Sequence, residues 1–166
     1  PILVSLAAEA VDAAGVGALR DYVAAGGTLF VGSSAFTRNA DGSARTDFAL
    51  SAEMGLHVVL PPAQNWYKNL GFTKLADHRL VAGLPPGPVT WRMPLNSEQI
   101  PLGVSPGHSV HGGHYVFRVS ADSGTTIIAN GDAGALIAVR PYGQGNFVYH
   151  GAAQPLIGHG VYDPAM

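Results

Sequence analysis

Apolar residues near the start of the chain form two short continuous runs with one helical stripe between them. Residues 2–7 (ILVSLA) and 28–32 (TLFVG) are apolar runs of strand length. The residues between them recur at the three- and four-residue spacing of one helix face: Val11, Val16, Leu19, Tyr22 and Val23. The glycine pair in "YVAAGG" then suits the left-handed backbone that ends a helix. This pattern predicts a β–helix–β unit with two parallel strands.

The pattern continues with a helix and a strand and then changes character. Residues 45–56 can form a helix, and residues 57–61 (HVVLP) predict a third strand of the parallel sheet. Proline and glycine punctuate the second half, where short apolar runs predict strands over residues 89–94, 115–120, 125–131, 135–141 and 146–152. The turn "YGQG" predicts a hairpin between the last two strands. We therefore expect an α/β fold with a mainly parallel sheet and an antiparallel extension in its C-terminal half.

Composition narrows the class of protein. The 166 residues fit a single domain, and 47% of them are hydrophobic, which is enough for a packed core. Only 12% are charged, against about 25% in an average soluble domain, so we expect part of the surface to be covered by another domain or subunit. The chain opens inside a strand-like run and stops at "GVYDPAM" without a finishing element, which predicts that it belongs to a longer protein.

Charge and cysteine content exclude several function classes. The net charge is −2, and the nine Lys and Arg residues form no basic stripe, so neither nucleic acid nor an anionic membrane is an expected partner. No apolar run has the roughly 18 residues that a membrane span needs. The chain has no cysteine, which excludes disulfides, a thiolate nucleophile and zinc–thiolate sites. "RPYGQG" lacks the spacing of a phosphate loop, and we expect no cofactor.

Three segments occur in an informative order: "LRDYVAAGGTLFVG", then "DHRLVAGLP", and near the end "TTIIANGDAGALIAVRPYGQGNFVYHGA". This order resembles the glutamine-amidotransferase-like α/β superfamily, especially its non-catalytic accessory branch, such as the trimerisation domain of some β-galactosidases. The branch shares a helix with "YV-x-x-GG", a strand, and a late strand pair joined by "YG-x-G". The resemblance implies a flavodoxin-like three-layer sandwich with its ligand crevice at the carboxyl ends of the strands.

The resemblance also implies where a nucleophile would lie. In the catalytic members, a cysteine follows the glycine-preceded strand and is partnered by a late histidine–any–glutamate pair. Here Ser33 or Ser34 takes the cysteine position, and the late His159 is followed by "GVY" and Asp163. A serine elbow needs Gly-x-Ser-x-Gly, but Phe36 replaces the second glycine. The main interpretation is a serine turn that caps the next segment or bonds its own backbone.

Three histidines recur in "HSVHGGH": His108, His111 and His114. Imidazoles are common metal ligands, so a metal site is one interpretation of this loop. Ligands on a helix are usually four residues apart and those on a strand two apart, whereas this three-residue spacing fits no element that converges all three. The main interpretation is a solvated or hydrogen-bonding loop.

Aromatic residues offer a sugar-stacking platform as a third possibility. Trp66 and Tyr67 lie in the polar segment "QNWYKN", and Trp91 and Tyr115 lie on predicted strands. A tryptophan that fills a core gap is the alternative interpretation.

The leading hypothesis from these observations is a non-catalytic accessory or interaction domain of a larger, carbohydrate-processing protein. Its expected partners are neighbouring domains or other subunits, and carbohydrate. Two enzyme hypotheses compete with it: a hydrolase using Ser34 with a late histidine such as His159, and a metal-dependent hydrolase using the histidine loop. A sugar-binding module is the third.

Overall fold

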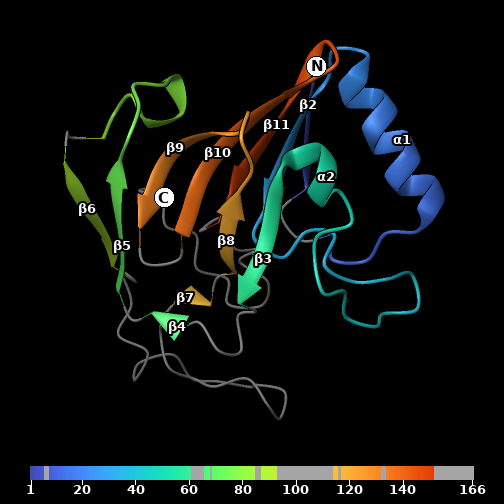
Figure 1. Cartoon of the computed structure of the whole chain (residues 1–166), viewed down its shortest axis with the longest axis horizontal. Coiled ribbons are helices and arrows are strands. Elements are labelled where there is room, and N and C mark those ends of the chain that lie inside the picture. Colours follow the sequence, from blue (N-terminus) through green and yellow to red (C-terminus); the bar gives the residue numbers. More distant parts are fainter. Residues whose placement is uncertain are drawn as a thin grey trace, which may run out of the picture.

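The computed structural model describes residues 1–5, 8–60, 66–67, 69–84, 87–92, 114–115, 117–131 and 134–151. These residues form the helices α1 (Ala13–Ala24) and α2 (Ser51–Met54) and the 3-10 turn η2 (Arg79–Val81). The strands are β1 (Ile2–Ser5), β2 (Thr28–Gly32), β3 (Leu56–Leu60), β4 (Trp66–Tyr67), β5 (Asn69–Lys74), β6 (Pro88–Arg92), β7 (His114–Tyr115), β8 (Arg118–Ala121), β9 (Thr126–Gly131), β10 (Gly134–Tyr142) and β11 (Gly145–His150). Nine of these strands form one mixed sheet, and β4 pairs with β7 separately (Figure 1).

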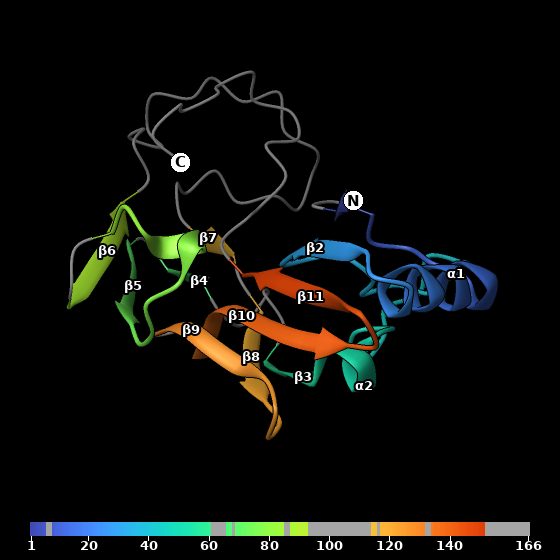
Figure 2. The ribbon, with the colours of Figure 1, turned by 90° about the horizontal axis from the view of Figure 1, so that it is seen from above.

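The parallel part of the sheet consists of β1, β2 and β11. Thr28 of β2 lies opposite Ile2 of β1 and Asn146 of β11. The helix α1 connects β1 to β2 and lies beside β2 and β11 (Figure 2). Asp12 caps its start, because the carboxylate accepts a hydrogen bond from the Gly15 N–H at 2.7 Å, and Gly26 follows its end at φ 105°. The predicted β–helix–β unit is confirmed.

The rest of the main path is antiparallel, in the order β11, β10, β9, β5, β6. Gly143 and Gln144 join β10 to β11 as a two-residue hairpin, with Tyr142 opposite Gly145. The "YGQG" hairpin and the antiparallel extension are therefore confirmed. The sheet as a whole is mixed and not mainly parallel, since most of its described strand pairs are antiparallel.

The third predicted strand forms but lies elsewhere in the sheet. β3 pairs antiparallel with β8, with Val58 opposite Val119. Among the described strands it is not hydrogen-bonded to β1 or β2. β8 in turn meets β10 at a single position, Gly134 opposite Val119. The prediction that β3 extends the parallel sheet is wrong, because β11 takes the place beside β2 that a third parallel strand would occupy.

The helix predicted over residues 45–56 is reduced to α2. Its N-terminal half is a loop because the N–H groups there donate to the turn after β2. Arg45 N donates to Thr37 O, and Ala49 N donates to Phe36 O, both at 2.9 Å. These hydrogen bonds replace the helical ones until Ser51.

Two clusters of buried side chains form the core. The first contains Val23 of α1 and Met54 of α2 together with Leu29 and Phe147 of the sheet, so both helices cover the same sheet face. The second cluster lies around β9 and β10 and includes Val81 of η2. On the face opposite the helices, the outer part of β1 is exposed, with Ile2 at 70% and Val4 at 58%.

Candidate functional site at the carboxyl ends of the parallel strands

The turn after β2 holds the two candidate serines. Ser33 is 2% exposed, and the Ala35 N–H donates to Gly32 O at 3.2 Å to close the turn. Phe36 has a left-handed backbone, with φ 63°, and its side chain is buried. In a nucleophile elbow the strained residue is the nucleophile itself. Here the strained residue is Phe36, and neither serine has a left-handed backbone.

The hydroxyl groups of Ser34 and Thr37 in this turn differ in their hydrogen bonding. Thr37 Oγ1 donates to Ser34 O at 2.7 Å, so the threonine side chain bonds the backbone of the turn. Ser34 Oγ is buried and has no hydrogen-bond partner in the described part of the chain. Among the described residues, Ser34 Oγ therefore neither caps a segment nor bonds its own backbone, and no imidazole activates it.

Two further buried hydroxyls, which have no partner among the described residues, lie near the same end of the sheet. Ser5 is the last residue of β1, Tyr149 is the penultimate residue of β11, and β2 with its Ser34 turn lies between these strands. Burial raises the pKa of the Tyr149 phenol, so it stays protonated at neutral pH. A buried polar group without a partner costs about 1–3 kcal/mol and is normally bonded to protein or ordered water. These hydroxyls give the carboxyl ends of β1, β2 and β11 a polar character.

His150, the last residue of β11, lies at this end of the sheet on the opposite face. Its ring is 6.0 Å from the Phe30 ring, centre to centre, and it is aligned with Gly32 in the β2–β11 ladder. Burial lowers the pKa of His150 to about 4, so the imidazole is neutral at neutral pH.

The remaining candidate residues from the sequence either lie outside the described residues or are located by their backbone. His108, His111, His159 and Asp163 lie outside the described residues. The backbone places Trp66 and Tyr67 on β4, His114 on β7 and Trp91 on β6. The β4–β7 pair sets Tyr67 opposite His114, which brings an aromatic candidate beside a metal candidate. Within the described ranges no group of three or more His, Cys, Asp or Glu side chains could hold a metal ion.

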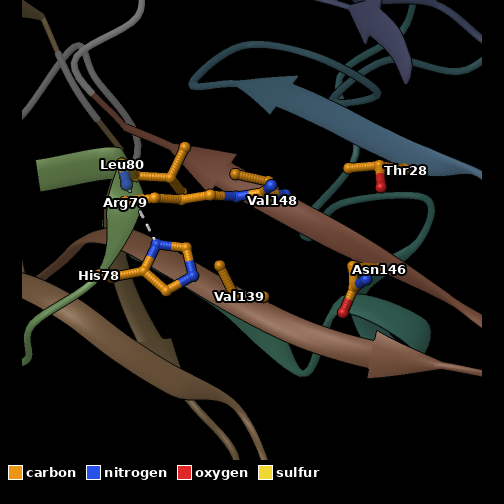
Figure 3. Close-up of a pocket in the computed structure, with 7 residues that line it drawn as sticks. All are labelled: Thr28, His78, Arg79, Leu80, Val139, Asn146 and Val148. Atoms are coloured by element: carbon orange, nitrogen blue, oxygen red, sulfur yellow. Dashed lines mark hydrogen bonds between the residues drawn. The ribbon is translucent and has the colours of Figure 1, made fainter. Parts of the chain in front are cut away.

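A small pocket lies between η2 and the sheet face opposite α1 (Figure 3). Its volume is about 100 Å³, and it is lined by Thr28, His78, Arg79, Leu80, Val139, Asn146 and Val148. His78 Nδ1 accepts a hydrogen bond from Leu80 N at 3.2 Å, so the neutral ring carries its hydrogen on Nε2. The pocket thus has a lining of both apolar and polar residues. It is smaller than the roughly 300–1,000 Å³ of typical small-molecule sites.

A histidine flanked by two carboxylates forms the most clearly defined polar cluster. His57 Nδ1 lies 2.7 Å from Asp47 Oδ2, and His57 Nε2 lies 3.2 Å from Asp122 Oδ2. The hydrogen bond with Asp47, followed by that with Asp122, raises the pKa of His57 above its ordinary value of 6.5. In a Ser-His-Asp triad the second ring nitrogen faces a hydroxyl, whereas here it faces another carboxylate. Sequence reasoning missed this cluster, because its members are 10 and 65 residues apart and share no motif.

No protein-family model and no curated protein matches this chain. Solved structures do match in fold. A β-galactosidase from Bacillus circulans sp. alkalophilus matches with a TM-score of 0.62 and 13% identity, over 93% of this chain and 20% of that chain. A β-galactosidase from Rahnella sp. R3 matches with a TM-score of 0.61 and 12% identity, over 91% and 20%. The mmIFT52 N-terminal domain matches with a TM-score of 0.56 and 12% identity, over 92% and 65%.

The chain is an α/β fold similar to one part of these β-galactosidases. It spans about a fifth of their length. At 12–13% identity the likeness establishes the fold alone. In the described part of the chain, no helix has the length and apolar character to cross a membrane.

Proposed function

We propose that this chain is a non-catalytic accessory domain of a larger carbohydrate-processing protein, where it packs against neighbouring domains or other subunits. The observation that carries the proposal is the extent of the structural match. More than 90% of this chain aligns with only 20% of each β-galactosidase chain. The same fold therefore occurs as one part of a long glycosidase chain.

An exposed apolar strip supports a packing role. Ile2 and Val4 are 70% and 58% exposed, and they lie on the sheet face opposite the helices. Exposed apolar patches on protein surfaces often mark sites where another protein binds. We propose that a neighbouring domain or subunit covers this face and completes a flavodoxin-like three-layer arrangement.

A non-catalytic role fits the turn after β2. The chain has no cysteine, and Ser34 Oγ has no base among the described residues. We propose that the chain belongs to the accessory branch of the glutamine-amidotransferase-like superfamily. The motifs "YVAAGG" and "YGQG" support this assignment, because their glycines meet where the hairpin packs on the end of α1.

Sedimentation analysis of the chain at increasing concentration tests the packing role. We expect self-association that Val4→Ser weakens, because the substitution removes apolar surface from the exposed face of β1. Val59→Ser is the matched control, since Val59 on β3 is also 58% exposed but lies away from β1. A native chain that stays monomeric would contradict assembly with other subunits through this face. Equal weakening by both substitutions would show that the β1 face has no special role.

A further inference from the structure

His57 connects three segments that are distant in the sequence. It lies on β3, Asp47 lies in the long loop after β2, and Asp122 begins the turn between β8 and β9. Asp47 is itself held in place, because its Oδ1 accepts hydrogen bonds from Phe48 N at 2.8 Å and Val58 N at 2.9 Å. The Asp122 N–H donates to Gly55 O at 2.9 Å. The two carboxylates are therefore fixed on opposite sides of one imidazole.

Both nitrogens of this imidazole face a carboxylate oxygen within hydrogen-bond distance. A neutral imidazole carries one N–H, so one nitrogen would present a lone pair to a negatively charged oxygen. Only the imidazolium form can donate to both carboxylates at once. The geometry thus selects the protonated ring.

We propose that Asp47, His57 and Asp122 form a proton-dependent latch that holds the loop after β2 and the β8–β9 turn against β3 when His57 is charged. This inference does not rest on the proposed function. When His57 loses its proton, one of the two carboxylates loses its donor, and the latch weakens. The backbone hydrogen bonds to Asp47 and from Asp122 remain, so the loop loosens without detaching.

The other charged side chains on the surrounding elements are Arg38, Asp41, Arg45, Glu53, Arg118 and Arg140. Most are engaged elsewhere: Arg38 pairs with Glu9, Asp41 bonds Ser43, and Glu53 faces Arg20. Arg45 and Arg140 donate to backbone oxygens and to Thr125. Arg118 shares the outer face of β8 with Ser120, which lies opposite His57. The two carboxylates contact the ring directly and are the charged groups that act on it.

The latch acts on the first core cluster. Phe48 follows Asp47, is 3% exposed, and packs edge-on against Tyr149 with ring centres 5.8 Å apart. Movement of Asp47 would therefore weaken the packing of Phe48 against Tyr149 of the sheet. The expected readouts are the stability of the domain and the protection of loop amides such as Ala49 N–H, which donates to Phe36 O.

The sign of the pH dependence follows from the direction of the pKa shift. The pKa of His57 in the folded protein lies above the unfolded value of 6.5, so the stabilisation is complete below 6.5 and is lost as pH rises through the folded pKa. The pKa of His150 is shifted the other way, and that side chain lowers stability only as pH falls below 6.5. Above about pH 6.5, the pH dependence of the free energy of unfolding therefore reports on His57 and not on His150.

The test combines an NMR pH titration of the His57 ring with urea unfolding between about pH 6.5 and about pH 9. We expect a His57 midpoint above 6.5 that falls in Asp122→Asn, and a decline in the free energy of unfolding with pH that is absent in His57→Gln. His78→Gln is the matched control, because His78 caps η2 and does not belong to the Asp47–His57–Asp122 cluster, and this variant should keep the decline. Exchange of the Ala49 amide, corrected for the intrinsic pH dependence of exchange, should accelerate across the same window in the native chain and in His78→Gln but not in His57→Gln.

Two results would overturn the latch. One is a His57 midpoint at or below 6.5 in the native chain, which would show that the two carboxylates do not favour the charged ring. The other is an unchanged pH dependence of stability in His57→Gln. The NMR titration reads the native fold directly, so the first result remains informative even if a variant folds poorly.

Discussion

At the scale of single residues, the strained backbone of the turn after β2 and its hydroxyl groups belong to different residues. Phe36 carries the left-handed backbone, Thr37 supplies the hydroxyl that bonds the turn, and Ser34 has a buried hydroxyl without a partner among the described residues. Phe36 is held in this conformation because its N–H donates to Ala8 O at 2.9 Å and its side chain is buried in the first core cluster. The strain at this turn therefore fixes a core side chain, and no nucleophile occupies the strained position.

Ser34→Ala should leave the free energy of unfolding unchanged or raise it by up to about 1 kcal/mol, because the buried hydroxyl that it removes has no hydrogen-bond partner among the described residues. A small loss would be expected instead if the Ser34 hydroxyl bonded a backbone group. Urea unfolding measures the change. Thr37→Val is the matched control and should cost about 0.5–1.5 kcal/mol, since it removes the donor to Ser34 O.

The same pair of variants tests the hydrolase alternative. We expect no stoichiometric labelling of the native chain by a fluorophosphonate probe, because a serine hydroxyl needs a positioned base to become nucleophilic. Labelling that disappears in Ser34→Ala and persists in Thr37→Val would overturn the non-catalytic proposal. A loss of stability of 1 kcal/mol or more in Ser34→Ala would show that its hydroxyl is hydrogen-bonded after all.

At the scale of elements, two glycine motifs that are far apart in the sequence form one contact. A Cβ on Gly143 would lie 2.6 Å from Ala24 Cα, and a Cβ on Gly145 would overlap Gly27 O and Val23 O. The Gln144 N–H also donates to Ala24 O at 3.0 Å. The hairpin between β10 and β11 thus rests directly on the backbone at the end of α1, which is possible only without side chains at these positions.

Gly145→Ala should lower the free energy of unfolding by about 1–3 kcal/mol or more, since the new methyl group meets backbone atoms that cannot rotate away. Gly17→Ala is the control within α1. Its Cβ would meet nothing within 4 Å, so the better helix propensity of alanine should stabilise the protein by about 0.5–1 kcal/mol. Urea unfolding of both variants measures the difference. Similar effects of the two substitutions would contradict a close contact between the hairpin and α1.

At the scale of the whole molecule, β10 joins the two core clusters. Ala135 and Ala138 belong to the first cluster, whereas Leu136 and Ile137 belong to the second. The strand changes register against β9 between Ala135 and Ala138, and this irregularity lets adjacent residues serve both clusters. We expect the clusters to unfold together for this reason.

Leu136→Ala should destabilise the protein by about 2–5 kcal/mol, because it removes buried methyl groups from a side chain that is 1% exposed. Native-state hydrogen exchange should show reduced protection on β2 in the first cluster as well as on β9 in the second. Protection lost on β9 alone would show that the clusters unfold independently, which would contradict the single domain expected from the sequence.

The sequence by itself determined the elements whose signal is local. The apolar runs at residues 2–7, of which 2–5 form β1, and at 28–32, the helical stripe between them and the glycines of "YGQG" each need only neighbouring residues to specify their conformation. β5 was missed because its sequence, "NLGFTK", is partly polar and contains a glycine, and it becomes a strand only by pairing with β6 and β9.

Tertiary structure decided which strands pair and which polar groups meet. β11 lies beside β2 although Asn146, which lies opposite Thr28, comes 118 positions later in the sequence, and no local pattern distinguishes that partner from β3. The Asp47, His57 and Asp122 side chains converge only because β3 pairs with β8 and the loop after β2 returns to β3. Such contacts depend on the packing of the whole sheet, since the free energy of a polar contact between distant residues is set by the elements that hold them.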